Sequence, residues 1–98
     1  MAGLPSLHIN EFFRPVTETE TKIRQIIVDA MRLETPAQDL KGQDLEAELG
    51  LTSVDALEIL IRTEIEFGIR IADEDLSGDL VRSISALETY VGAKLQGT

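Results

Sequence analysis

The first segment with a helical pattern covers residues 18 to 33. Its apolar side chains recur every three or four residues, as on one face of a helix. They are Ile23, Ile26, Ile27, Ala30 and Met31. Thr17 and Glu20 fit a capping box, in which the Thr hydroxyl and the Glu carboxylate accept hydrogen bonds from free backbone amides. The pattern therefore predicts an amphipathic helix that begins directly after Thr17.

A second segment, residues 54 to 67, is apolar on two faces of the expected helix. It contains neither Gly nor Pro, and Gly68 supplies a C-terminal cap. One face, which we name the apolar ridge, consists of Val54, Leu57, Ile61 and Ile65. The opposite face consists of Ala56, Ile59, Leu60, Thr63 and Phe67. Such a helix either lies at the centre of its domain or offers one face to a partner, and periodicity alone leaves both interpretations open.

The remaining segments complete an all-α pattern. Residues 34 to 52 form a long connection that is punctuated by leucines, which favours a loop packed on the core. These leucines are Leu40, Leu45, Leu49 and Leu51. Residues 73 to 76 indicate a single-turn helix, and Ser83 caps a last helix. The apolar face of that helix is Ile84, Leu87, Val91 and Leu95. We expect four helices, the third very short, in a domain of residues 17 to 98 that follows an irregular N-terminal extension, residues 1 to 16.

Composition restricts the function of such a domain. The chain has 98 residues, a formal charge of −9 and no Cys, so it forms one small domain without disulfides, thiolate metal sites or a cysteine nucleophile. His8 is the only histidine, which argues against imidazole catalysis and His-rich metal sites. The acidic balance argues against nucleic-acid binding, and no apolar run is long enough for a membrane span or signal peptide. We expect a cytoplasmic protein with basic partners.

The acidic residues are concentrated around the second helix. Residues 39 to 75 contain eleven acids and three bases, a net charge of −8, which leaves −1 for the rest of the chain. A solvated face usually mixes both signs. We therefore interpret this region as a surface that attracts basic partners.

Ser53 stands where the long loop meets the second helix, and three roles fit this position. It can cap the helix, or it can receive a phosphoester, because a helix N-terminus directs free amides toward an anion. Catalysis fits less well: Gly50 to Ser53 does not form the G-x-S-x-G elbow, and only His8 could act as base.

The sequence around Ser53 resembles the acyl carrier proteins. The resemblance rests on DLEAELGLTSVDALE at residues 44 to 58 and on IEFGIRIADED at residues 65 to 75. It extends from Thr17 to Leu95 and includes the long loop and the last helix with Tyr90. It implies a four-helix acyl-carrier-like bundle in which Ser53 carries 4′-phosphopantetheine, donated from coenzyme A by a phosphopantetheinyl transferase. The arm would bring the thiol that the chain lacks.

The resemblance also orients the second helix. In the family, the side that holds Ala56, Ile59, Leu60 and Phe67 faces the core. This leaves the apolar ridge for partner enzymes, such as acyl-loading ligases or transferases and synthases with basic docking surfaces. The partner-binding residues implied are Asp55, Leu57, Glu58, Ile61 and Ile65.

Several positions depart from the usual family pattern. Thr52 replaces an Asp that helps the transferase to position its metal and the serine, Ile65 replaces an acid, and Arg62 adds a positive charge. Together with residues 1 to 16, these departures indicate a specialised carrier rather than a housekeeping one. We expect that Leu7, Ile9, Phe12 and Phe13 cover part of the apolar ridge, or that two chains bury it together, in a monomer or weak homodimer.

The leading prediction is a non-enzymatic carrier of acyl thioesters in fatty acid, lipid or polyketide-type biosynthesis. The alternative is an interaction module that retains the carrier fold without the prosthetic arm, for which Thr52 is the sequence support. A small hydrolase that uses Ser53 lacks both base and elbow.

Overall fold

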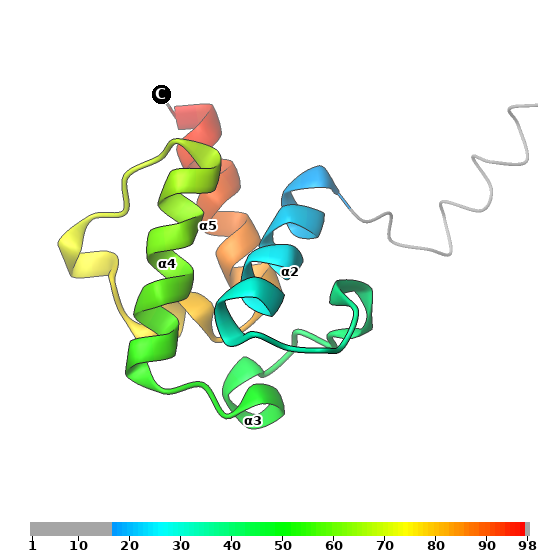
Figure 1. Cartoon of the computed structure of the whole chain (residues 1–98). Coiled ribbons are helices and arrows are strands. Elements are labelled where there is room, and N and C mark those ends of the chain that lie inside the picture. Colours follow the sequence, from blue (N-terminus) through cyan, green and yellow to red (C-terminus); the bar gives the residue numbers. More distant parts are fainter. Residues whose placement is uncertain (1–16, 98) are drawn as a thin grey trace, which may run out of the picture.

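Four α-helices form the framework of residues 17–97, which this computed structural model describes (Figure 1). They are α2 (Glu18–Met31), α3 (Leu45–Leu49), α4 (Ser53–Phe67) and α5 (Ile84–Gly97). Three 3-10 helices lie in the connections: η1 (Ala37–Asp39), η2 (Asp73–Asp75) and η3 (Gly78–Val81). These residues contain no strand, so the predicted all-α fold is confirmed. Residues 1–16, with Leu7, Ile9, Phe12 and Phe13, lie outside the described residues, as does Thr98.

Helix α2 begins where the sequence predicts. The Thr17 hydroxyl accepts a hydrogen bond from the Glu20 amide at 2.9 Å, and the Glu20 carboxylate accepts one from Arg24 Nε at 2.9 Å. Arg24 also donates to the carbonyl oxygens of Ala37 and Leu40. The start of α2 and the first part of the long loop are therefore joined through one arginine.

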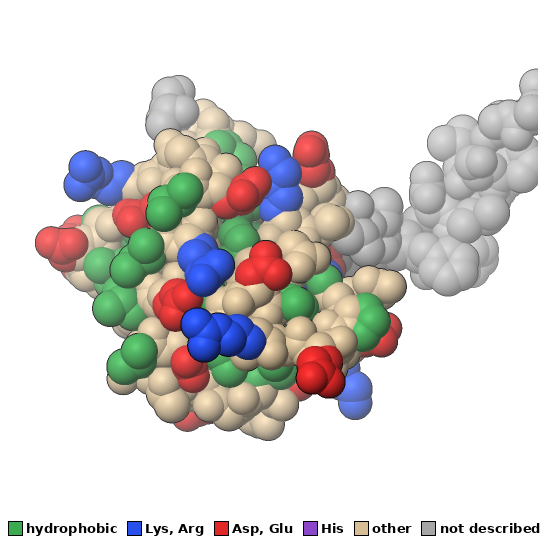
Figure 2. Space-filling model, viewed as in Figure 1, with side chains coloured by type: hydrophobic (Ala, Val, Ile, Leu, Met, Phe, Trp, Pro, Cys, Tyr) green, Lys and Arg blue, Asp and Glu red, His purple; other side chains and the backbone are tan. Residues whose placement is uncertain are grey.

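Burial distinguishes the two apolar faces of α4. Ala56, Ile59, Leu60 and Thr63 are buried, whereas the apolar ridge is exposed, from 46% at Leu57 and Ile61 to 77% at Ile65. Figure 2 shows hydrophobic side chains gathered beside α4 at the left of the molecule. The core-facing side implied by the family resemblance is thus the side that the fold buries.

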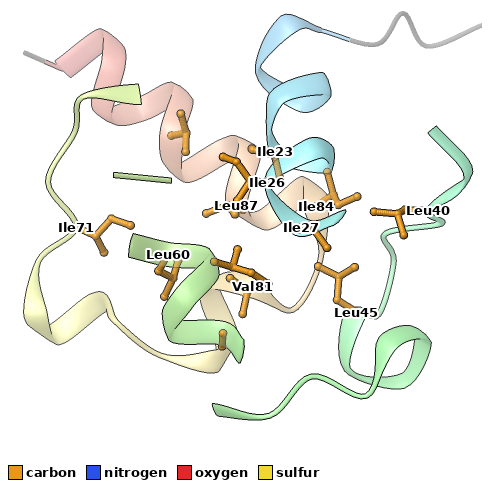
Figure 3. Close-up of a cluster of buried hydrophobic side chains, with 13 residues drawn as sticks. Ile23, Ile26, Ile27, Leu40, Leu45, Leu60, Ile71, Val81, Ile84 and Leu87 are labelled. Carbon is orange, nitrogen blue, oxygen red and sulfur yellow. The ribbon is translucent and has the colours of Figure 1, made fainter. Parts of the chain in front are cut away.

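The long loop contributes directly to the core, as its leucines predict. Leu40 and Leu45 are buried, and Figure 3 shows both extending from the loop toward the core. Leu49 and Leu51 are half-buried against the same cluster. The following side chains are fully buried: Ile23, Ile27, Leu45, Ile59, Leu60, Val81, Leu87 and Val91.

Two backbone hydrogen bonds join the loop to the start of α5, and we name this pair the loop clasp. The Ile84 amide donates to the Gly42 carbonyl oxygen at 2.9 Å, and the Leu45 amide donates to the Arg82 carbonyl oxygen at 2.9 Å. Within the loop, the Glu48 carboxylate of α3 accepts from the Lys41 and Gly42 amides at 2.8 and 2.9 Å. The loop is therefore bonded both to the start of α5 and to itself.

The segment between α4 and α5 is more irregular than the sequence predicts. The expected single-turn helix near residue 73 is the 3-10 turn η2, followed by η3, while the short α-helix α3 lies in the long loop, where no helix was expected. The Tyr90 hydroxyl donates to Asp75 Oδ2 at 2.9 Å, which ties η2 to α5. Ser83 caps α5 as predicted, with Oγ 3.0 Å from the Ala86 amide.

Two further expectations concern the surface. Leu95 is 46% exposed, so the buried face of α5 ends before the position that the pattern includes. Within residues 17–97, no helix is long and apolar enough to cross a membrane.

We predict that Gly42→Ala destabilises the fold strongly. Gly42 has a φ of +74°, and an added Cβ would stand 2.5 Å from Ile84 Cδ1. Overpacking costs roughly 1–3 kcal/mol and a left-handed non-glycine residue costs roughly 1–2 kcal/mol. Urea unfolding should show a loss of about 3 kcal/mol or more. The matched control is Gly50→Ala, because Gly50 also has a positive φ but open space around it. Equal losses in the two variants would contradict the steric argument.

Candidate functional site

Ser53 is the first residue of α4, and Thr52 caps the helix. Thr52 Oγ1 accepts a hydrogen bond from the Asp55 amide at 3.2 Å, and Asp55 Oδ2 accepts one from the Thr52 amide at 3.0 Å. This reciprocal pair is a capping box. The interpretation of Ser53 as the helix cap is therefore wrong, because the preceding hydroxyl fills that role.

The shift of the cap by one residue leaves the Ser53 hydroxyl available. Ser53 is exposed, and its hydroxyl forms no hydrogen bond within the described part of the chain. The backbone N–H groups of Ser53 and Val54 likewise donate to no acceptor in residues 17–97. An exposed hydroxyl thus stands next to two free donors at the positive end of a 15-residue helix.

Two cavities meet at Ser53. The larger, of about 490 Å³, lies between the start of α4, the residues around α3 and the η3 segment. Its charged lining residues are Asp44, Glu46, Asp79 and Arg82. The smaller, of about 180 Å³, is more apolar and includes Leu57, Leu60 and Leu76. A group attached to Ser53 can therefore enter either a charged or an apolar space.

Ion pairs partly neutralise the acidic surface that the sequence predicts around α4. Glu58 pairs with Arg62 at 2.8 Å, and Glu66 lies 3.8 Å from Lys22 of α2. Asp55 accepts from the Thr52 amide within the capping box. The acids beside the apolar ridge thus have partners within the chain, and Figure 2 shows positive and negative side chains interleaved on this face. The ridge presents exposed apolar surface with charges of both signs.

The described residues offer Ser53 neither an imidazole nor a metal. His8 lies outside residues 17–97, and no group of His, Cys, Asp or Glu within that range could hold a metal ion.

Sequence reasoning did not connect Arg82 or Asp79 with Ser53. Both lie far along the chain and reach the larger cavity only because η3 packs beside α4. No local motif marks them. Only the tertiary arrangement brings them to the site.

We predict that the neighbouring hydroxyls contribute differently to stability. Thr52→Ala removes the helix cap and should lower the free energy of unfolding by about 1 kcal/mol. Ser53→Ala removes a hydroxyl without an intramolecular partner and should change it by less than about 0.5 kcal/mol. Urea unfolding followed by circular dichroism measures both values. A larger loss for Ser53→Ala than for Thr52→Ala would contradict the assigned cap.

A comparison with protein families agrees with this geometry. The family described as phosphopantetheine attachment site matches residues 21–91, which include Ser53, most of α2, the long loop, α4 and the first part of α5. A comparison with solved structures gave no match. The matched region is the kind of domain to which 4′-phosphopantetheine is covalently attached. The chain therefore belongs to the phosphopantetheine attachment family and is a carrier domain consistent with the acyl carrier proteins.

Proposed function

We propose that Ser53 is the attachment residue and that the domain carries acyl intermediates to partner enzymes. The observation that supports this assignment is the exposed hydroxyl at the start of α4, which is not used as a cap and stands beside two free amides. Among the roles considered for Ser53, phosphoester attachment is the one that uses all of these features.

The residues around Ser53 fit the phosphopantetheine group. The Ser53 and Val54 amides would donate to its phosphate, and the capping box of Thr52 and Asp55 would hold the helix start in place. When bound, the group supplies a terminal thiol, the acceptor for an acyl chain, to a protein that has no Cys. The chain itself would hold the arm in position and keep its attachment point exposed to partner enzymes, as expected for a non-catalytic carrier.

The spaces beside Ser53 support an acyl cargo. The smaller cavity is bordered by Leu57, Leu60 and Leu76, and it offers apolar surface to an acyl chain. We propose acyl intermediates of fatty acid, lipid or polyketide-type biosynthesis as the cargo. The protein would then be a member of a multi-enzyme route rather than an enzyme.

The apolar ridge is the proposed partner surface. Leu57, Ile61 and Ile65 form its centre, and their exposure gives a partner apolar contact area. Asp55 and Glu58 lie along the same helix and would attract basic residues of the partner. Because Glu58 is already paired with Arg62, a fitting partner combines an apolar groove with charges that complement both members of this pair.

Modification of the purified protein tests the attachment residue. Incubation with coenzyme A and a broad-specificity phosphopantetheinyl transferase should add the mass of one phosphopantetheine, as measured by intact mass spectrometry. Ser53→Ala should remain unmodified. Ser77→Ala is the matched control, because Ser77 is also exposed and borders the smaller cavity, and this variant should be modified like the unaltered protein.

Two outcomes would contradict the assignment. An adduct on Ser53→Ala would place the arm elsewhere. No adduct in this reaction, and none on protein isolated from its native host, would support the alternative of an interaction module without the arm. Thr52→Asp serves as a second probe. Asp also caps helices, so the variant should retain its stability. It should be modified faster, because in the resembling family an Asp at this position helps the transferase.

The partner surface has a separate test. Ile61→Ser should raise the KM of a partner enzyme for the carrier severalfold, because the apolar contact is lost while the fold is unaffected. Leu95→Ser is the matched control, since both side chains are 46% exposed but Leu95 lies on α5. Steady-state kinetics with the transferase or an acyl-loading ligase measures the effect. Equal KM values for the two variants would contradict the assignment of the ridge.

A further inference from the structure

Arg82 is the cationic residue that lines the larger cavity beside Ser53. The other charged side chains that line this space are Asp44, Glu46 and Asp79. A phosphodiester on Ser53 adds another negative charge to a space bordered by three carboxylates. Like charges that line one cavity repel one another, so a nearby positive charge would favour a phosphate there.

The side chain of Arg82 can change its partner at low cost. Its Nη2 lies 3.2 Å from Asp79 Oδ1, and the two side chains are 72% and 84% exposed. An ion pair this exposed contributes little to stability, because water screens it. The guanidinium is therefore free to exchange Asp79 for a stronger anionic partner.

The backbone of Arg82, in contrast, is fixed. Its carbonyl oxygen accepts from the Leu45 amide in the loop clasp, and its amide donates to the Asp79 carbonyl oxygen at 3.2 Å. These bonds hold the backbone of Arg82 between the start of α3 and the end of η3. Arg82 thus has a fixed backbone at the wall of the cavity and a cationic side chain that can change its partner.

We propose that Arg82 binds the phosphodiester of the phosphopantetheine on Ser53 and so fixes the direction in which the arm leaves the helix. The planar guanidinium offers two parallel N–H donors to phosphate oxygens, a stronger arrangement than its single contact with Asp79. The arm would then start within the larger cavity, between α3 and η3. Arg82 is in this sense a positioning residue. The inference rests on the proposed attachment at Ser53.

The direct test uses the full chain with isotopically labelled arginine side chains. NMR spectra are recorded before and after complete conversion to the phosphopantetheine form, with loading confirmed by mass spectrometry. The Nε–Hε signal of Arg82 should shift on conversion, and by more than that of Arg70, which is also exposed but does not line the cavity. An Arg82 signal that moves no more than that of Arg70 would overturn the inference.

The phosphorus signal of the arm gives a second, independent readout. Its chemical shift should change in loaded Arg82→Ala, change only partly in Arg82→Lys, and stay constant in loaded Arg70→Ala. An unchanged phosphorus signal in loaded Arg82→Ala would also overturn the inference while leaving attachment at Ser53 intact. Failure of the proposed function is recognised separately, as the absence of an adduct on Ser53 in the unaltered protein. The Arg82 Nε measurement needs no variant, so it decides the question even if Arg82→Ala loads poorly.

Discussion

The loop clasp helps to determine where Ser53, the proposed attachment residue, lies. Through it, Gly42 and Leu45 bind the residues at the start of α5, and the long loop crosses the end of the bundle at a fixed level. Helix α3 begins at Leu45, a residue of the clasp, and three residues separate the end of α3 from the start of α4. Each of these hydrogen bonds contributes only about 0.5–1.5 kcal/mol. Together with the burial of Leu40 and Leu45, they fix the course of the loop that leads to Ser53.

Several parts of this arrangement could be predicted from the sequence because they depend on local pattern. Helices α2, α4 and α5 repeat apolar residues over three or more turns, and their caps at Thr17 and Ser83 are short-range hydrogen bonds. The two faces of α4 could not be told apart by periodicity, since both are apolar. Burial depends on which neighbours pack against the helix, and here Ile59 and Leu60 face the core while Ile61 faces outward.

The features that the sequence did not predict depend on tertiary contacts. Helix α3 has only five residues, too few for a helical repeat, and it is stabilised by the Asp44 cap and by the bond from Leu45 to Arg82. The cap of α4 was ambiguous because Thr52 and Ser53 are adjacent and both side chains suit the role. The backbone decides between them, since Thr52 is extended, with φ −95° and ψ 172°, as is typical of a residue that caps a helix. Arg82 joins the site only through the packing of η3.

The cap at Thr52 has a consequence for the working cycle of the carrier. The residue that caps α4 is distinct from the residue proposed to be modified, so a group attached to Ser53 would leave the hydrogen bonds between Thr52 and Asp55 in place. Partner enzymes that distinguish empty from loaded carriers would therefore not find the difference in this cap. They have to detect it in the arm and its cargo, which makes recognition of the protein and recognition of its chemical state two separate tasks.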